Sequence, residues 1–221
     1  MLSSSDVPQC PATGVKAGVH SMMADLDAHG ARTAWLAAHL CERLGVSPIT
    51  ARAIGQAART HDIGKTFLPE ALLDKPAELT RDERAQIERH CTLGACALMG
   101  PHDHHTTNLT GDALVALLHH EWWNGQGYPF GLSKDEIPRS ARIVAVADVF
   151  DALLVARPYK PAWPQDRALD HIWRHRGTQF DPECVEALME VAPSLPRGWL
   201  AALPRTAMLS AGTAIPVLFP G

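Results

Sequence analysis

The segment His61-Asp62-Ile63-Gly64-Lys65 places two candidate metal ligands side by side in this chain. It follows a helical pattern that begins at Ser47-Pro48, where serine is a good N-cap and proline fits the first turn. The histidine-aspartate pair is therefore expected at a helix C-terminus. Adjacent residues on a helix diverge by about 100°, so His61 and Asp62 together can reach two neighbouring metal ions, with the short carboxylate able to bridge them. Binuclear metal sites are built in this way.

A second histidine-rich stretch lies downstream, where His119-His120-Glu121 runs into Gly127-Tyr128-Pro129. Apolar residues at helical spacing over 112–120 predict a helix that ends in the paired histidines. The glycine-rich segment 124–134 is expected to be an exposed loop, either a small hairpin or an extended lid. Paired metal ligands in both stretches point to metal-assisted phosphodiester hydrolysis.

Helical patterns dominate the remaining sequence. Apolar residues at helical spacing predict helices over 20–44 and 141–156. Thr80 and Glu83 have the spacing of a capping box, which predicts a helix that continues to Leu98 and carries His90. Asp181-Pro182 predicts the start of a last helix over 183–191. The expected fold class is all-α, as one compact multi-helix domain.

Length, charge and proline distribution bound the organisation of the chain. Its 221 residues fit one full-sized domain, expected at 19–192, with an N-terminal tail at 1–18 and a proline-rich C-terminal extension at 193–221. The formal net charge of −4 and the scattered Lys and Arg residues provide no basic stripe, which argues against a DNA or RNA polymer as substrate.

The cysteines and the hydropathy pattern indicate the cellular compartment. The chain has 5 cysteines, an odd number, and no C-x-x-C pair, which argues against a disulfide framework or a structural zinc site. No segment has the pattern of a signal peptide or of a membrane span. We therefore expect a cytoplasmic protein that does not insert into a membrane.

The motifs together resemble the HD-GYP domain, over residues from about 20 to 190. An isolated H-D-x-G-K would indicate only the wider HD hydrolase superfamily, whereas the Gly-Tyr-Pro loop and Arg157-Pro158-Tyr159-Lys160 are specific to this branch. The other matching motifs are His29-Gly-Ala-Arg32, His90-x-x-x-Gly94, Ile137-Pro138, Ala141-Arg142-Ile143, Ala147-Asp148-x-Phe-Asp151-Ala152 and Phe180-Asp181-Pro182. The resemblance implies an all-helical HD-type fold and hydrolysis of the bacterial second messenger cyclic di-GMP to pGpG, with GMP as a candidate final product.

The resemblance also implies a centre of two divalent metal ions, with iron or manganese as the metals that suit its nitrogen-rich, carboxylate-bridged ligands best. Zinc, cobalt and nickel stay open. Asp25 stands one helical turn before the first histidine and is a candidate ligand for a third ion. The seven implied ligands, all present in this chain, are His29, His61, Asp62, His90, His119, His120 and Asp148.

The expected chemistry follows from charge. Two divalent ions outweigh the carboxylates of Asp62 and Asp148, so the site attracts a dianionic cyclic dinucleotide. A water shared by the metals would attack phosphorus as hydroxide, and Lys65 would stabilise the charge that develops. By resemblance, Arg157 and Lys160 contact phosphate and Tyr128 packs against a guanine. The implied protein partners are GGDEF-type diguanylate cyclases, docked through the Gly-Tyr-Pro loop, and a second copy of the chain in a homodimer.

Two other functions stay open. The domain could sense cyclic di-GMP, or dock a diguanylate cyclase, without hydrolysis; alternatively, it could hydrolyse another guanine nucleotide. Asn124 stands where the family usually has aspartate, which puts a loop or partner contact in doubt rather than the metal site. The segment His102-Asp103-His104-His105 lies outside the matching motifs and is read as a loop. Asp151 is expected to support the fold by hydrogen bonding, with a role beside a metal ligand as the alternative.

Overall fold

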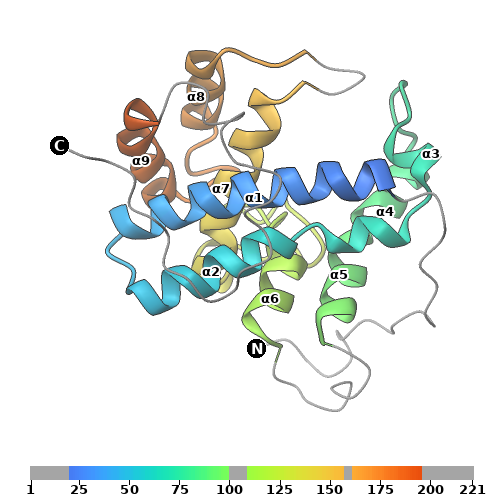
Figure 1. Cartoon of the computed structure of the whole chain (residues 1–221), viewed down its shortest axis with the longest axis horizontal. Helices are drawn as coiled ribbons and strands as arrows, with labels where there is room; N and C mark the ends of the chain where they lie inside the picture. Colours follow the sequence, from blue (N-terminus) through green and yellow to red (C-terminus); the bar gives the residue numbers. More distant parts are fainter. Residues whose placement is uncertain (1–19, 100–108, 157–160, 196–221) are drawn as a thin grey trace.

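The computed structural model describes residues 20–99, 109–156 and 161–195, and the regular elements of these segments are all helices (Figure 1). The all-α fold predicted from the sequence is confirmed. Two isolated β-bridges, Asn124 with Ser133 and Arg176 with Phe180, complete the described secondary structure. The α-helices are α1 (His20–Arg43), α2 (Pro48–Thr60), α3 (Glu70–Leu73), α4 (Arg81–Glu88), α5 (His90–Met99), α6 (Gly111–Leu118), α7 (Arg139–Leu154), α8 (Gln165–Arg174) and α9 (Pro182–Val191). The short 3₁₀ helices are η1 (Ile63–Phe67), η2 (Lys134–Glu136) and η3 (Ala192–Ser194).

Helix α7 lies at the centre of this arrangement. It packs against α1, α2, α6, α8 and α9, and Figure 1 shows α1 crossing in front of it with α2 alongside α1. Most of its residues are buried, including Val144, Phe150 and Asp151. A helix that is apolar on all sides is expected in the interior, and the aspartates on such a helix need buried partners.

The buried apolar residues form two clusters. The larger one joins α1, α2, α7, α8 and α9 around fully buried side chains such as Leu36, Phe150 and Leu188. The smaller one joins α5, α6 and the start of α7 around Leu117 and Ile137. Among the described helices, none is long and apolar enough to cross a lipid bilayer.

The caps expected from the sequence are present at the helix starts. The Ser47 side chain accepts the Thr50 N–H at the start of α2, and Thr80 and Glu83 form the reciprocal capping box of α4. Asp181 accepts the Glu183 N–H at the start of α9. These caps satisfy main-chain N–H groups that have no partner inside the helix.

Several helices differ from the sequence expectation, including the short helix α3, which was not predicted. The helix predicted over 80–98 is divided into α4 and α5 at Arg89, where the His90 ring bonds to the Ile87 carbonyl. Helix α7 begins and ends two residues before its predicted bounds. Helix α8 was not predicted, because only Ala168 and Ile172 of its residues are buried and its apolar pattern is correspondingly sparse.

The backbones of η1 and α5 meet at Gly64. A Cβ atom at this position would lie 1.9 Å from the His90 carbonyl oxygen and 2.5 Å from the Gly94 nitrogen. No side chain can be accommodated there, so the close contact requires glycine. The turn after His61-Asp62 is thereby docked directly on the first turns of α5.

Candidate metal centre

Three helix ends deliver buried histidines to one place. His61 is the C-cap residue of α2, His90 is the first residue of α5, and His119 is the C-cap residue of α6. Each ring places Nδ1 against a main-chain carbonyl, which can only accept, so each Nδ1 carries the proton. The partners are the carbonyls of Ala58, Ile87 and Ala116, at 2.6, 2.7 and 3.0 Å. Each Nε2 therefore keeps its lone pair, as a metal ligand requires.

The Asp62 carboxylate lies between two groups of these nitrogens. Its Oδ2 atom is 3.5 Å from His61 Nε2 and 3.9 Å from His29 Nε2. Its Oδ1 atom is 3.4 Å from His90 Nε2 and 3.7 Å from His119 Nε2. The two oxygens thus face different sets of donors, which is the geometry of a bridging carboxylate.

The separations fit shared cations. Ligands about 2.1 Å from one tetrahedral ion lie about 3.4 Å apart, close to the distances around Asp62. Asp62 Oδ1 and His61 Nε2 are also buried without a hydrogen-bond partner among the described residues. Such atoms are costly unless something else satisfies them, and a divalent cation would do so. Among the described residues, candidate donor atoms form three sets, and the atoms within each set lie within 4.8 Å of one another. The sets are His29, His61 and Asp62; His61, His119 and Asp148; and His90, Cys91, His119 and His120.

We call His29, His61, Asp62 and Asp148 the carboxylate-rich side of the centre. Here His29, on α1, places Nε2 2.9 Å from Asp148 Oδ1, on α7. Burial opposes a charge on His29, but hydrogen bonds to Asp148 and Asp151 raise its pKa to about 9. The ring is therefore protonated at neutral pH in the protein alone, and a cation at Nε2 would take the place of that proton.

A chain of ionic hydrogen bonds holds the His29 ring from behind. Its Nδ1 donates to Asp151 Oδ2 over 2.6 Å, and Arg32 donates to both oxygens of Asp151 over 2.6 and 2.9 Å. A carboxylate behind a histidine fixes the orientation of the ring and increases its basicity as a ligand. Asp151 thus forms supporting hydrogen bonds and also lies beside a candidate metal ligand, His29.

Lys65 lies at the same carboxylate. Its Nζ donates to Asp62 Oδ2 over 2.5 Å. Burial would raise the pKa of Asp62, but Lys65, followed by His61, holds it well below its ordinary value. Asp62 is therefore ionised, and one cationic side chain already stands next to the oxygen that faces the carboxylate-rich side.

We call His90, His119 and His120 the histidine-rich side of the centre. Burial lowers the pKa of His90 to about 3 and also lowers the pKa of His120 well below its ordinary value. These rings are neutral at any physiological pH and need lose no proton to bind a metal. The two sides of the centre thus differ in charge before any cation arrives.

The Gly-Tyr-Pro loop is clamped onto the histidine-rich side. The buried Glu121 carboxylate accepts the Phe130 and Leu132 N–H groups over 2.7 and 3.0 Å. A Cβ atom at Gly127 would lie 2.2 Å from the Trp122 nitrogen and 2.5 Å from the His120 carbonyl oxygen. The loop therefore follows the backbone of the His119-His120-Glu121 segment so closely that only glycine fits.

Tyr128 is half-buried, unlike the exposed loop residue expected from the sequence. Its ring stacks on the His120 ring, with centroids 4.8 Å apart and planes at 29°, and its N–H donates to the His120 carbonyl. Sequence reasoning missed this packing because the glycines around it indicate a turn without saying what the turn contacts. Asn124, at the exposed start of the loop, accepts the Gln126 N–H and so keeps the turn-forming role that aspartate would have.

The remaining predicted site residues are not brought into the centre by the described structure. Asp25 is exposed on α1, one turn before His29, and belongs to none of the three donor sets found among the described residues. Arg157, Lys160 and the segment 102–105 lie outside the described residues. Cys91 joins a donor set although the sequence analysis did not single it out; its place directly after His90 was the available signal.

An all-helical fold that gathers histidines and aspartates from several helices into one buried cluster defines the class of HD-type domains. The sequence profile of the HD domain family matches residues 19–184. The chain belongs to the HD domain family, and Gly127-Tyr128-Pro129 places it in the HD-GYP branch. Membership of the family implies binding of divalent metal, in agreement with the histidine-aspartate cluster.

Two curated relatives and one solved structure show what the chain resembles. It is 48% identical over 158 residues to the cyclic di-GMP phosphodiesterase response regulator RpfG of Xanthomonas campestris, covering 72% of this chain and 41% of the relative. It is 34% identical over 172 residues to the 3'3'-cGAMP-specific phosphodiesterase 2 of Vibrio cholerae, covering 78% of this chain and 32% of the relative.

The crystal structure of a Vibrio cholerae cyclic GMP-AMP-specific phosphodiesterase has the same fold. It aligns with a TM-score of 0.61 at 20% identity, over 83% of this chain and 50% of the other. This chain thus spans less than half the length of the two curated relatives and half of the solved chain.

Proposed function

We propose that this domain is a metal-dependent phosphodiesterase that hydrolyses cyclic di-GMP to pGpG and then to GMP. The observation that carries the proposal is the position of Asp62, whose two oxygens face separate groups of histidine nitrogens. The similarity to RpfG, named as a cyclic di-GMP phosphodiesterase, supports the choice of substrate. The proposed catalytic domain is 19–192, with the segments 1–18 and 193–221 as appendages.

The proposed ligands divide between two ions. His29, His61 and Asp148 would hold the first ion and His90, His119 and His120 the second, with Asp62 shared between them. When bound, the ions supply Lewis acidity and lower the pKa of a coordinated water so that it can attack phosphorus at neutral pH. Iron and manganese suit this nitrogen-and-carboxylate set. Asp25 is proposed for a third ion only, because its exposed place on α1 lies outside the donor sets.

Side chains around the centre would orient the substrate and balance its charge. Lys65, already paired with Asp62, is placed to offset negative charge on the phosphoryl oxygens or on the departing 3′ oxygen. By family resemblance, Arg157 and Lys160 would hold the phosphates. Tyr128 would contact a guanine through the part of its ring that His120 does not cover.

The cellular setting is also a proposal. Four buried cysteines without disulfides, Cys41, Cys91, Cys96 and Cys184, suit the reducing cytoplasm. Diguanylate cyclases of the GGDEF type would dock on the Gly-Tyr-Pro loop, whose tip at Asn124 and Gln126 is exposed. A homodimer is the proposed assembly, by resemblance to the family.

A second candidate substrate is 3'3'-cGAMP. It is favoured by the 34% identity to a Vibrio cholerae phosphodiesterase named as specific for that dinucleotide. The two substrates share the cyclic phosphodiester ring and differ in one base, so the metal centre described above would serve either. The discrimination must then come from residues that contact the base.

The proposal is tested by product chromatography. The purified protein is loaded with iron(II) or manganese(II) under reducing conditions and incubated with cyclic di-GMP, 3'3'-cGAMP or linear pGpG. We expect cyclic di-GMP to give pGpG and then GMP, with slower cleavage of 3'3'-cGAMP. Binding of cyclic di-GMP without turnover under every metal tried would contradict the enzyme and support the sensor alternative.

Calorimetric titration separates substrate binding from metal binding. In Arg157→Ala the metal content should equal that of the wild type, because Arg157 is not a proposed ligand. The affinity for cyclic di-GMP should fall about ten- to more than a hundredfold, the equivalent of a lost charge-assisted hydrogen bond. Unchanged affinity would show that the dinucleotide does not contact this residue.

A further inference from the structure

Cys91 is a fourth donor on the histidine-rich side. We propose that its thiolate is an additional ligand of the ion held by His90, His119 and His120, which makes this half of the centre a sulfur-containing site for zinc or iron(II) rather than manganese. The inference rests on the proposed two-ion centre and deepens it, because it assigns a different metal preference to each half. Soft thiolate ligands select zinc and imidazole nitrogens suit zinc and iron, whereas carboxylate oxygens suit manganese.

The placement of Cys91 carries the inference. It follows His90 in the first turn of α5, and its side chain is fully buried. Its Sγ atom lies 3.6 Å from His90 Nε2 and is within 4.8 Å of the donor nitrogens of His119 and His120. With Asp62 shared, Cys91 would be the fifth ligand of this ion. An ion about 2.3 Å from sulfur and about 2.1 Å from nitrogen separates the two ligand atoms by roughly 3.1–3.8 Å for the bond angles of about 90–120° found in five-coordinate sites. The observed separation matches that arrangement.

The Cys91 S–H group and a bound cation would compete for the same lone pair, that of His90 Nε2. The Nδ1–H of this ring donates to the Ile87 carbonyl, so Nε2 is the nitrogen that can accept the Cys91 S–H. A cation that binds Nε2 removes this acceptor and leaves a buried thiol proton without its partner. Coordination resolves this: a metal–sulfur bond forms, the S–H bond breaks, and the proton leaves to bulk water without any change in oxidation state.

The surroundings of Cys91 explain why a metal is needed to form the thiolate. Burial, followed by the Asp62 carboxylate, raises the pKa of the Cys91 thiol well above its ordinary value. Without a cation the group therefore stays a protonated, unreactive thiol. A coordinated thiol is deprotonated outright, because the charge of the ion outweighs the burial penalty.

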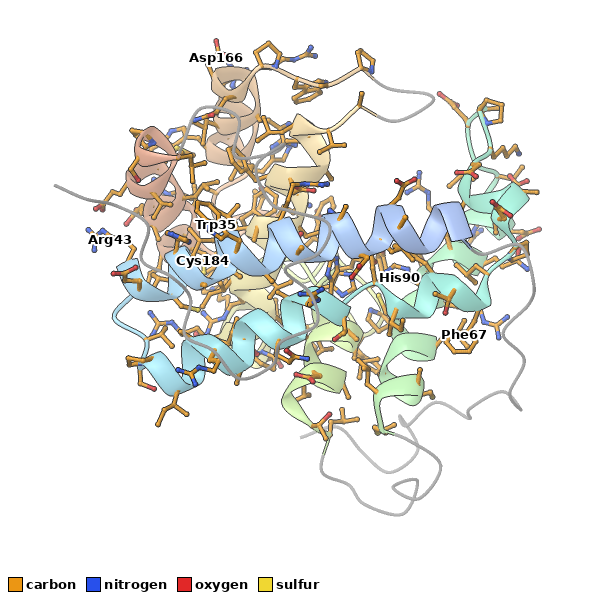
Figure 2. All side chains as sticks on the ribbon, viewed as in Figure 1. Trp35, Arg43, Phe67, His90, Asp166 and Cys184 are labelled. Carbon is orange, nitrogen blue, oxygen red and sulfur yellow. The ribbon has the colours of Figure 1, made fainter. Side chains whose placement is uncertain are left out.

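Two of the other described cysteines provide the contrast. Cys41, on α1, and Cys184, on α9, are buried in the larger apolar cluster and belong to none of the donor sets found among the described residues. Figure 2 shows Cys184 well separated from His90. Cys184→Ala is therefore a matched control, which removes one buried thiol without touching the histidine-rich side.

The first test uses cobalt(II) as an optical probe. Wild-type protein, Cys91→Ser, Cys91→Ala and Cys184→Ala are freed of metal under reducing conditions and titrated with cobalt(II). We expect two ions per chain and a near-ultraviolet sulfur-to-cobalt charge-transfer band in the wild type and in Cys184→Ala. Both Cys91 variants should lose the band and keep the visible d–d bands.

The outcomes separate this inference from the proposed function. Two bound cobalt ions without a charge-transfer band in the wild type would overturn the assignment of Cys91 and leave the two-ion centre intact. A band that persists in both Cys91 variants would also overturn it. Failure of the folded wild-type protein to bind cobalt at all would overturn the centre and the inference together, with folding checked by circular dichroism.

The second test measures metal preference. Zinc and manganese affinities are determined by competition with a chelator in the same four proteins. Loss of a protein group behind a metal ligand costs about 10- to 100-fold in affinity, so losing a direct ligand should weaken zinc binding at least as much. Manganese affinity should change by less than the zinc affinity in Cys91→Ala. Equal zinc affinity in the wild type and both Cys91 variants would contradict the proposal.

Discussion

The two sides of the metal centre are held in place by different forces. On the carboxylate-rich side, a hydrogen bond to Asp151 orients His29, and Arg32 in turn donates a hydrogen bond to Asp151. Hydrogen bonds between ionised side chains therefore fix this side. On the histidine-rich side, main-chain carbonyls orient His90 and His119, and the Gly-Tyr-Pro loop packs on His120. Loss of a charged side chain should therefore disturb the carboxylate-rich side, whereas a change in packing should disturb the histidine-rich side.

The largest effect is expected where the two sides meet, at Asp62. Asp62→Ala removes both oxygens that face the donor groups, so we expect loss of measurable turnover and of at least one bound ion. Metal analysis and product chromatography measure this, and circular dichroism should show that the helices remain. Wild-type metal content and rate would refute the two-sided centre. His104→Ala, outside the described residues, is the control expected to behave as wild type.

Charge on the carboxylate-rich side is tested at Asp151. Asp151→Asn keeps the shape of the side chain but loses the charge that His29 and Arg32 share. We expect affinity for one of two ions to fall about 10- to 100-fold while the other ion binds as before. Stepwise metal titration with calorimetry measures both affinities. An equal loss at both sites would show that Asp151 supports the whole fold rather than one side.

Fit on the histidine-rich side is tested at Gly127. In Gly127→Ala the new methyl group would meet the Trp122 nitrogen and the His120 carbonyl, so the loop must shift. We expect a loss of about 1–3 kcal/mol in unfolding free energy, as for other overpacked positions. Urea denaturation measures it. Gly111→Ala is the matched control, because a methyl group there meets nothing within 4 Å; equal destabilisation of both variants would contradict the clamped loop.

The smallest effect is expected from the ring that covers His120. Tyr128→Leu removes the aromatic stacking and should weaken metal binding at the histidine-rich side by about 2- to 13-fold, the equivalent of about 0.5–1.5 kcal/mol. Tyr128→Phe keeps the ring and should bind metal as the wild type does. Chelator competition measures both variants. A weakened Tyr128→Phe would show that the hydroxyl, rather than the stacked ring, supports the ligand.

The fold and the principal donors could be predicted because they depend on local patterns. Caps such as Ser47 and the Thr80–Glu83 pair act within one helical turn, so the sequence shows them directly. The seven implied ligands came from the resemblance to the HD-GYP domain, and all seven belong to the three donor sets found among the described residues. Their roles as ligands stay a prediction.

The remaining features depend on contacts between distant segments. Nothing near Arg32 in the sequence indicates that its guanidinium donates hydrogen bonds to Asp151 on another helix. The thiol of Cys91 resembles that of any buried cysteine until His119 and His120 are placed around it. Likewise, the stacking of Tyr128 on His120 depends on the path of the loop, which glycine permits but does not specify.

The backbone contact at Gly64 fixes the distance between the segment that carries Asp62 and the start of α5. Asp62 precedes Gly64 by two residues, and the His90 carbonyl oxygen is one of the atoms that Gly64 contacts. The segments that carry Asp62 and His90 therefore touch without an intervening side chain. Because backbone atoms make this contact, rotation of a side chain cannot change the distance between the two segments. A change in ion radius would therefore have to be taken up by the ligand side chains, while the distance between these two backbone segments stays the same.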